Sequence, residues 1–273
     1  AIEVAGSRCQ TMRLLTLLSD FGVNSPYPAA MKDVIAARVA AQCLDISHAV
    51  SRHNVREGAF LLASVVPFCL AGTVHLAVVD PGVGTTRRPL LVQAGGQYFV
   101  GPDNGLLMPA ARRLGIPRAY HLDPAVGLVP RSATFHGRDL FAPAAARLLL
   151  GEPPSRLGRL IDDPADLAFA PGRWAGEVLS GEVIYVDHFG NLITSIPEST
   201  VAPGAAFDLE TPQGTRRVRM RATYGSAAPA ELTLVAGSEG LLEIAVREGN
   251  AAAETGLRAG APVRLRAVRG TQA

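Results

Sequence analysis

The sequence predicts an α/β protein whose first domain has a largely parallel sheet and whose second domain is smaller and all-β. Three observations predict it. From about residue 14 to residue 150, short apolar runs alternate with longer segments of helical pattern. Between residues 151 and 176 the pattern dissolves into proline, glycine and scattered charge, which indicates a linker. Only short strand-like runs follow, so we expect domains at 12–152 and 176–270 joined by a linker at 153–175.

The first domain holds two apolar runs of strand length and three segments with helical periodicity. The predicted strands are Leu14–Leu18 and Thr73–Val79, and the predicted helices are Val55–Leu70, Asp103–Leu114 and Arg138–Leu149. Pro143 is compatible with the last helix because it falls in an early turn, where its missing N–H costs little. Strands separated by helices favour the parallel sheet.

The second domain shows five short runs separated by turn residues. These runs are Glu182–Val186, Arg216–Met220, Leu232–Val235, Leu241–Val246 and Val263–Val268. Their length and spacing fit a small β-sandwich or barrel better than a helical domain.

Composition excludes several classes of function. The 273 residues are 48% hydrophobic and carry a formal charge of +2, from 26 basic and 24 acidic residues. This balance argues against a nucleic-acid or membrane-surface partner, so small molecules or proteins are expected. Lys32 is the sole lysine, and no glycine-rich loop precedes it, which excludes a phosphate-binding loop.

Targeting signals and metal motifs are also missing from the sequence pattern. Cys9, Cys43 and Cys69 match neither a metal ribbon nor a disulfide framework, so we expect free thiols, no metal and no cofactor. The apolar stretch 59–76 is interrupted by polar and helix-breaking residues and is a poor membrane span. The segment Ala1–Gln10 lacks a secretory pattern, and the expected location is the cytoplasm.

Polar residues that directly follow apolar runs are the first candidates for a site, because ligands bind beyond the carboxyl ends of parallel strands. Four segments qualify, namely Ser19–Gly22, Asp80–Arg88, Gly101–Gly105 and Thr134–Asp139. Each also has a structural interpretation. Asp20 could cap a turn, Asp103 could cap a helix, and Asp80 could form a salt bridge that serves only its own loop. His136 alone would more often be a structural histidine.

The ordered set of these segments, together with Asp187–Asn191 and Gly237–Ala245, resembles the S-adenosylmethionine hydroxide adenosyltransferases. These enzymes are related to the fluorinase and the chlorinase. The resemblance spans about residues 14–266. It implies a Rossmann-like first domain, a β-barrel second domain and a homotrimer whose active sites lie between one subunit's first domain and a neighbour's second domain.

The resemblance also implies roles for single residues. Asp20 is similar to the carboxylate that accepts both ribose hydroxyls, and Asp80, Arg87 and His136 resemble the family's water-handling triad. In the second domain, Asp187 resembles the acid near the methionine ammonium, and Phe189 belongs to the same substrate-binding motif. Asn191 resembles the amide that reads the adenine edge, and Asn250 resembles a residue that lines the adenine pocket. Ser238, beside Glu239, resembles a donor to the methionine carboxylate.

The implied reaction is hydrolysis of S-adenosyl-L-methionine to adenosine and L-methionine, without a cofactor. Water attacks the ribose C5′, and the sulfonium leaves as a neutral thioether that needs no acid. Asp80 and His136 can both accept the water's proton, whereas Arg87 can only donate and would orient Asp80. The charge of Asp80 disfavours a halide nucleophile. The alternatives are a chlorinase that forms 5′-chloro-5′-deoxyadenosine, and a protein that binds the substrate without turnover.

Overall fold

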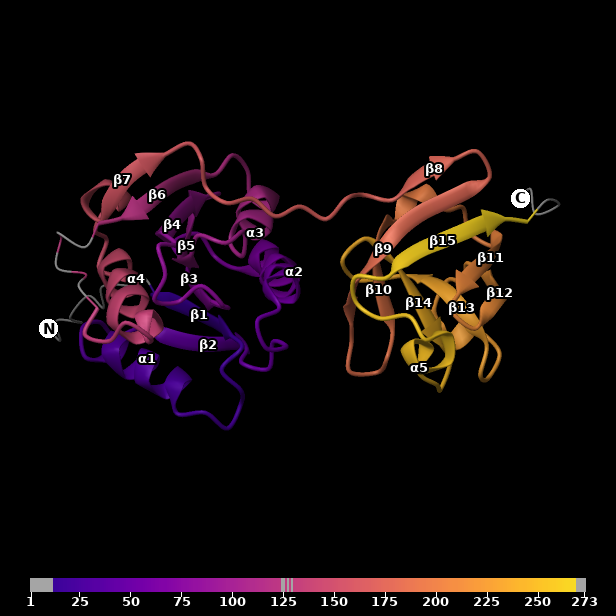
Figure 1. Ribbon diagram of the computed structural model, residues 1–273, viewed down its shortest axis with the longest axis horizontal. Helices are drawn as coiled ribbons and strands as arrows, with labels where there is room; N and C mark the ends of the chain where they lie inside the picture. Colours follow the sequence, from indigo (N-terminus) through magenta and orange to yellow (C-terminus); the bar gives the residue numbers. More distant parts are fainter. Residues whose placement is uncertain (1–11, 124–125, 127, 129, 269–273) are drawn as a thin grey trace, which may run out of the picture. The chain divides into compact units, whose positions relative to one another are not determined.

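The computed structural model describes residues 12–268 except residues 124, 125, 127 and 129. The segment Ala1–Gln10, with its predicted free thiol at Cys9 and its predicted lack of a secretory signal, lies outside the described residues. The chain forms two compact units, Ala1–Leu167 and Ala168–Ala273 (Figure 1).

A seven-stranded sheet forms the centre of the first unit, in the strand order β2-β1-β3-β5-β4-β6-β7. Its strands are β1 (Leu14–Ser19), β2 (Gln42–Ser47), β3 (Val74–Val78), β4 (Pro89–Ala94), β5 (Gln97–Pro102), β6 (Arg118–Leu122) and β7 (Gly158–Ile161). Strands β2, β1, β3 and β5 are parallel, whereas β4, β6 and β7 are each joined to the sheet by antiparallel pairing with the preceding strand in this order. The carboxyl ends of β1 and β3 therefore meet at one edge of the sheet.

Helices pack on both faces of this sheet (Figure 1). They are α1 (Tyr27–Ala36), α2 (Val55–Val65), α3 (Met108–Arg113) and α4 (Ala142–Leu149). Helix α1 packs against α4, and α2 packs against α3. Because strand side chains alternate, Leu15 and Leu17 of β1 join the core under α1 and α4. The neighbouring Leu18 lies instead beside Gly58 of α2.

The predicted helices exist, but two of them are shorter than their sequence patterns suggest. The α-helix that begins at Val55 ends at Val65, and Pro67 lies in the 3₁₀ turn Val66–Phe68 that follows it. Helix α3 begins at Met108, not at Asp103, and Asp103 does not cap it. The Asp103 carboxylate instead accepts hydrogen bonds from Arg88 and from the backbone of Ala165. The expected helix cap was therefore wrong.

The segment 153–175, expected to be a linker, contributes a strand to each unit. Strand β7 (Gly158–Ile161) pairs with β6, and β8 (Arg173–Ala175) pairs with β9 (Val178–Val186). Arg88 further holds this segment by donating to the side chain and the backbone carbonyl of Asp163. Proline and glycine mark turns correctly here, but strands of three or four residues fit between them without a recognisable pattern.

The second unit is a nearly closed antiparallel barrel with the strand order β12-β11-β15-β9-β10-β14-β13, and β8 pairs with β9. Besides β8 and β9 it contains β10 (Leu192–Pro197), β11 (Ala206–Thr211), β12 (Gly214–Arg219), β13 (Leu232–Ala236), β14 (Leu241–Val246), β15 (Pro262–Ala267) and the short helix α5 (Ala251–Thr255). A bridge between Met220 and Leu234 links the two ends of the sheet. The predicted fold class is confirmed, and the sandwich or barrel alternative is decided for the barrel.

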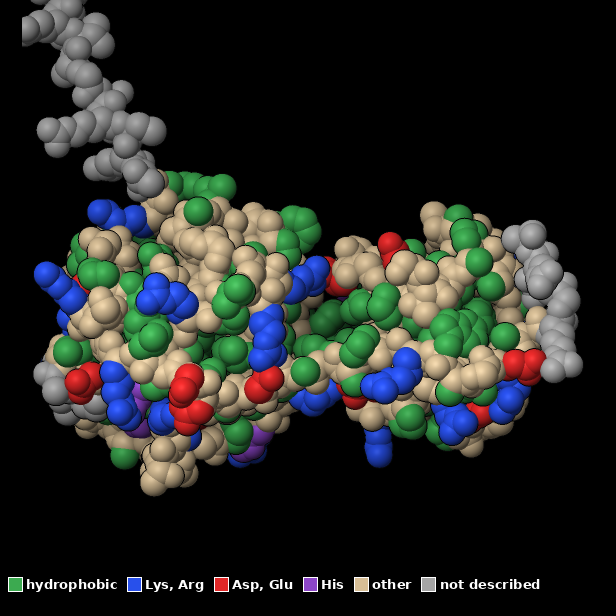
Figure 2. Space-filling model, turned by 90° about the horizontal axis from the view of Figure 1, so that it is seen from above, with side chains coloured by type: hydrophobic (Ala, Val, Ile, Leu, Met, Phe, Trp, Pro, Cys, Tyr) green, Lys and Arg blue, Asp and Glu red, His purple; other side chains and the backbone are tan. Residues whose placement is uncertain are grey.

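Charged side chains of both signs are interspersed on the face shown in Figure 2. This distribution agrees with the nearly balanced charge of the chain, +2 at neutral pH. Within the described residues, none of the helices has the length and apolar character needed to cross a membrane.

Candidate functional site

The loop that follows β3 carries Asp80 and Arg87, and two glycines determine its path. A Cβ on Gly82 would lie 3.2 Å from Arg87 Cγ, so this position must be small for the arginine to fold back. Gly84 adopts φ +77°, and a Cβ there would lie 3.0 Å from the carbonyl oxygen of Ala133. Glycine at these positions lets the loop fold back on itself and pack against the segment that carries His136.

Arg87 links Asp80 to His136. Its Nε donates to both carboxylate oxygens of Asp80, at 2.9 and 3.1 Å, and its NH2 also donates to Oδ2. The same NH2 group donates to Nδ1 of His136 at 3.0 Å. The side chains of Asp80 and Arg87 are 5% and 10% exposed. The arginine therefore does more than hold its own loop together, since it also binds a residue 49 positions away.

The contact with Arg87 determines which ring nitrogen of His136 carries the hydrogen. Burial lowers the pKa of His136 and the charge of Arg87 lowers it further, while Asp80 and Asp139 act in the opposite direction. A guanidinium can only donate, so Nδ1 must be the acceptor, and the ring hydrogen of the neutral imidazole is on Nε2. His136 thus presents a donor, not an acceptor, at its second nitrogen.

A cavity of about 360 Å³ brings three predicted residues together in the first unit. Asp20, Asp80 and His136 line it, whereas Arg87 does not. Arg52 and His53 also line this cavity, and the sequence analysis missed both because they belong to no motif. The N–H of His53 donates to Asp20 Oδ2 at 2.9 Å, so this residue helps to hold the Asp20 carboxylate.

One wall of this cavity is aromatic. Phe21, Tyr27 and Phe135 contact one another edge to face, with ring centroids 5.1 to 6.0 Å apart. Gly137 begins a π-helical turn, Gly137–Phe141, directly before α4. A Cβ on Gly137 would lie 2.9 Å from the sulfur of Met31 and 3.4 Å from the Phe135 ring. Glycine at this position therefore lets the turn after His136 pack closely on Met31 and Phe135.

A second cavity, of about 830 Å³, lies in the barrel unit and is lined by Asp187, Phe189, Asn191 and Asn250. All four were predicted from the sequence. Phe189 is 73% exposed, so its ring is accessible to a ligand in this cavity. Tyr224 also lines this cavity and was missed by the sequence analysis.

Asp187 shapes the turn that carries Phe189 and Asn191. Its Oδ1 accepts the backbone N–H groups of both residues, at 2.9 and 2.8 Å, and its Oδ2 accepts from Asn191 Nδ2 at 2.9 Å. These contacts orient the Asn191 amide. The arrangement suits the amide to reading a planar polar edge, whereas the Asp187 carboxylate is largely engaged within its own turn.

Asn250 combines a place in the second cavity with a structural task. Its Oδ1 accepts from the N–H of Ala253 at 2.8 Å and so caps α5. Gly190 packs on this amide so closely that a Cβ would lie 2.2 Å from Asn250 Cγ. The turn at Gly190 and the start of α5 are therefore fixed to one another.

Ser238 and Glu239 are not among the residues that line this second cavity. They lie on the turn between β13 and β14, which is closed by the hydrogen bond from Gly237 N–H to Leu241 O at 2.8 Å. Glu243 of β14 connects this turn to the cavity. A Cβ on Gly237 would lie 2.2 Å from Glu243 Oε1, and the Tyr224 hydroxyl donates to Glu243 Oε2. Burial raises the pKa of Glu243.

Among the described residues, no cluster of three or more His, Cys, Asp or Glu side chains is arranged to hold a metal ion.

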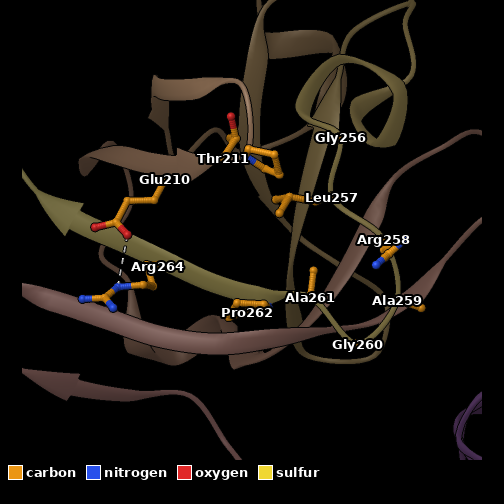
Figure 3. A pocket seen from close by; sticks show the side chains of 11 residues that line it. Glu210, Thr211, Gly256, Leu257, Arg258, Ala259, Gly260, Ala261, Pro262 and Arg264 are labelled. Atoms are coloured by element: carbon orange, nitrogen blue, oxygen red, sulfur yellow. Dashed lines mark ion pairs between the residues drawn. The ribbon is translucent and has the colours of Figure 1, made fainter.

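A third hollow, of about 660 Å³, lies beside the Glu210–Arg264 ion pair in the barrel unit, whose charged atoms are 3.2 Å apart (Figure 3). None of the sequence-predicted residues lines this hollow.

Known proteins match this chain over both units. An (R)-S-adenosyl-L-methionine hydrolase of Thermus thermophilus is 42% identical over 264 residues, covering 93% of this chain and 100% of that protein. A fluorinase of Actinopolyspora mzabensis is 28% identical over 214 residues, covering 67% of this chain and 71% of that protein. The crystal structure of an uncharacterized conserved protein of Thermotoga maritima superposes with a TM-score of 0.86 at 32% identity, covering 92% and 99% of the two chains.

Family models agree with these relatives. Residues 15–158 match the N-terminal domain of the SAM hydroxide adenosyltransferases, and residues 181–264 match the C-terminal domain. The two matched ranges contain every site residue predicted from the sequence. The chain therefore belongs to the SAM hydroxide adenosyltransferase family.

Proposed function

We propose that this protein hydrolyses S-adenosyl-L-methionine to adenosine and L-methionine by attack of water on the ribose C5′. One observation carries the proposal beyond family membership. The Asp80 carboxylate and a neutral His136 line the same cavity, and Arg87, which does not line it, donates hydrogen bonds to both. Such a pair can hold and deprotonate one water molecule.

The tautomer of His136 favours Asp80 over His136 as the acceptor of the water's proton. Because His136 carries its hydrogen on Nε2, it donates to a water oxygen and positions it. Asp80 then accepts a proton from the same water as the oxygen attacks. The O–C5′ bond forms, the C5′–S bond breaks with its electron pair going to sulfur, and the proton passes to Asp80 and then to solvent. Arg87 acts as a positioning residue for Asp80.

The substrate's other parts fit the remaining site residues. Asp20 lies in the same cavity as Asp80 and offers two carboxylate oxygens for the ribose diol. Exposed Phe189 and the oriented amide of Asn191 suit the face and the edge of an adenine ring. The family resemblance supports these assignments, and it also supports Ser238 and Glu239 at the methionine end.

The relatives named as (R)-S-adenosyl-L-methionine hydrolases support a stereochemical preference. We propose that the (R)-sulfonium epimer is the better substrate here. Separated epimers, each followed by chromatography of adenosine, provide the measurement. A higher kcat/KM for the other epimer would overturn this preference while leaving hydrolysis itself intact.

The decisive experiment is incubation of purified protein with S-adenosyl-L-methionine in buffer containing concentrated chloride, with products separated by chromatography and identified by mass. We expect adenosine and methionine. A product of 5′-chloro-5′-deoxyadenosine would show a chlorinase instead, and tight binding with the substrate left intact would show a binding protein. The negative charge of Asp80 disfavours the chlorinase, because a halide beside it would lose hydration and be repelled by the carboxylate.

We further propose that no metal or other cofactor takes part. The sulfonium is already an activated leaving group, so the reaction requires no Lewis acid at the departing atom. Dialysis against a chelator should leave the hydrolysis rate unchanged, and a loss of activity that added divalent metal restores would contradict this proposal.

The family resemblance supports two further proposals, a homotrimer and a cytoplasmic location. In the trimer, the first cavity of one copy and the second cavity of another would share one substrate molecule. The location is supported by Cys43 and Cys69, which are both unpaired, and burial raises the pKa of each thiol. Light scattering coupled to size exclusion and fractionation of cells test these two statements.

A further inference from the structure

A series of side-chain contacts runs behind the loop that carries Asp20. Ser19, the last residue of β1, has its Oγ 2.7 Å from Nδ1 of His48. On the other side of this ring, Nε2 lies 3.2 Å from Asp45 Oδ1. Asp45 in turn accepts a hydrogen bond from Lys32 Nζ at 2.6 Å. The series therefore connects the surface of α1 and β2 to the residue next to Asp20.

A bulge in β2 makes this arrangement possible. In the parallel pairing of β1 with β2, Leu17 lies opposite Asp45, but Leu18 lies opposite Ser47, so one residue of β2 is skipped. A bulge of this kind redirects the residues that follow it. His48 follows the last residue of β2, Ser47, and its backbone carbonyl accepts the N–H of Gly22 at 2.8 Å. His48 thus contacts both ends of the Ser19–Gly22 loop.

The hydrogen bonds around Ser19 assign the direction of the series. The N–H of Phe21 donates to Ser19 Oγ at 3.4 Å, so the hydroxyl hydrogen is free to point to Nδ1 of His48. On the far side of the ring, Nε2 lies 3.2 Å from the Asp45 carboxylate. Burial raises the pKa of Asp45, but the neighbouring Lys32 and His48 outweigh it and lower the pKa overall.

The order Asp45, His48, Ser19 resembles the triad of serine hydrolases, but burial excludes that role. Ser19 is 0% exposed, and His48 is 8% exposed. A nucleophilic hydroxyl must reach an external carbonyl, and this one cannot. The remaining role is to hold the loop in place. The Asp20 carboxylate itself accepts the N–H of His53 at 2.9 Å.

We infer that His48 is a positioning residue for ribose recognition. Its side chain fixes Ser19 and its carbonyl fixes Gly22, so the intervening Asp20 carboxylate is held where the two ribose hydroxyls arrive. This inference rests on the proposed function, since it concerns how the substrate's ribose is bound. It adds a residue outside the cavity, just after β2, to the groups on which that binding depends.

The test uses two ligands that differ only in the ribose hydroxyls, adenosine and 2′,3′-dideoxyadenosine, with affinities measured by calorimetry on the full chain. In His48→Ala we expect about tenfold weaker binding of adenosine, the size of one lost hydrogen bond to a charged site, and unchanged binding of the dideoxy ligand. His48→Asn should restore most of the affinity, because its amide oxygen can replace Nδ1 as the acceptor for Ser19.

A double-mutant cycle sharpens the result. In an Asp20→Ala background, His48→Ala should have no further effect on adenosine binding, since the group that it positions is gone. His121→Ala, which changes a partly buried histidine on β6 that lines none of the cavities described above, is the matched control and should bind both ligands normally. Thermal unfolding of each variant identifies any that are not folded.

The outcomes separate this inference from the proposed function. Equal loss of both ligands in His48→Ala, or no loss of either, would overturn the positioning role while leaving hydrolysis untouched. A wild-type protein that binds neither nucleoside, and that releases no adenosine from S-adenosyl-L-methionine, would overturn the proposed function and this inference with it.

Discussion

The contact between Arg87 and His136 assigns different tasks to Asp80 and His136, and substitutions can distinguish them. Asp80→Asn keeps the shape but removes the proton acceptor, so we expect kcat to fall by about 10² to 10⁴-fold. His136→Gln retains an N–H where Nε2 lies and should keep more activity than His136→Ala. Rates of adenosine formation at saturating substrate measure both effects. If His136 were the base, the Gln and Ala variants would be equally inactive.

The protonation of His136 predicts that kcat/KM falls at acidic pH. Burial and the charge of Arg87 lower the pKa of His136 below its ordinary 6.5. The neutral form, which Arg87 requires as an acceptor, therefore persists above pH 6.5, and we expect kcat/KM to fall only below that value. This fall in kcat/KM should be smaller in His136→Gln. A fall with its midpoint above pH 6.5 would contradict the neutral state assigned to His136.

At the scale of single residues, the sequence pointed to side chains that lie in one cavity, but not to the groups that hold them. Asp20, Asp80 and His136 each follow or precede a recognisable motif, and they meet in one cavity. His48 and His53 do not. His48 reaches Ser19 through a bulge whose register no periodicity reveals, and His53 contributes a backbone N–H, which any residue type can supply.

At the scale of elements, a buried polar group ties three strands together and makes their stability depend on pH. His75 of β3 is fully buried, its Nδ1 is 2.7 Å from the Thr16 hydroxyl of β1, and its Nε2 is 2.7 Å from Gln97 Oε1 of β5. Burial lowers the pKa of His75 from 6.5 to about 4. An unfolded chain therefore takes up a proton near pH 6.5, whereas the folded chain does not.

The free energy of unfolding should consequently fall as the pH drops from 6.5 to about 4, by about 3 kcal/mol from this group, and the stabilisation is fully present above pH 6.5. Urea unfolding at several pH values measures it. His75→Gln provides the comparison, because it lacks the titrating ring. A slope as steep in the variant as in the wild type would assign the effect to other groups.

The glycine at position 84 couples the backbone of the Asp80 loop to the segment before His136. Gly84→Ala places a Cβ 3.0 Å from the Ala133 carbonyl at φ +77°, so we expect about 1–3 kcal/mol of destabilisation and a clear loss of kcat as the loop shifts. Gly176→Ala is the control, because φ is +61° there with no atom within 4 Å of the new Cβ. Normal turnover in Gly84→Ala would show that loop placement tolerates this movement.

The elements themselves were predictable where their hydrophobic period was long. The strands at Leu14 and Val74 follow their patterns closely, and the helix predicted at Arg138–Leu149 ends as predicted, although its first turn is the π-helical turn Gly137–Phe141. The strand Gly158–Ile161 was not predictable, since a four-residue edge strand between prolines has too few side chains to show an alternation. Pairing with a neighbouring strand, not local propensity, determines the secondary structure of such segments.

At the scale of the whole molecule, the site residues fall into two sets on separate compact units, and this division allows a direct test of the proposed trimer. Asp80→Asn disables the first set, and Asn191→Ala disables the second. Each variant alone should be nearly inactive. Co-expression of the two, with different affinity tags and purification through both, yields mixed assemblies.

If each active site combines the first unit of one copy with the second unit of another, one of the three sites in every mixed trimer has two intact halves. Mixed assemblies purified through both tags should then recover about a third of the wild-type rate, while each variant alone stays inactive. If both halves of a site came from one chain, every site would carry one defect, and mixing would restore nothing. Light scattering on the same sample measures the number of copies, so the origin of the halves and the assembly size are determined independently.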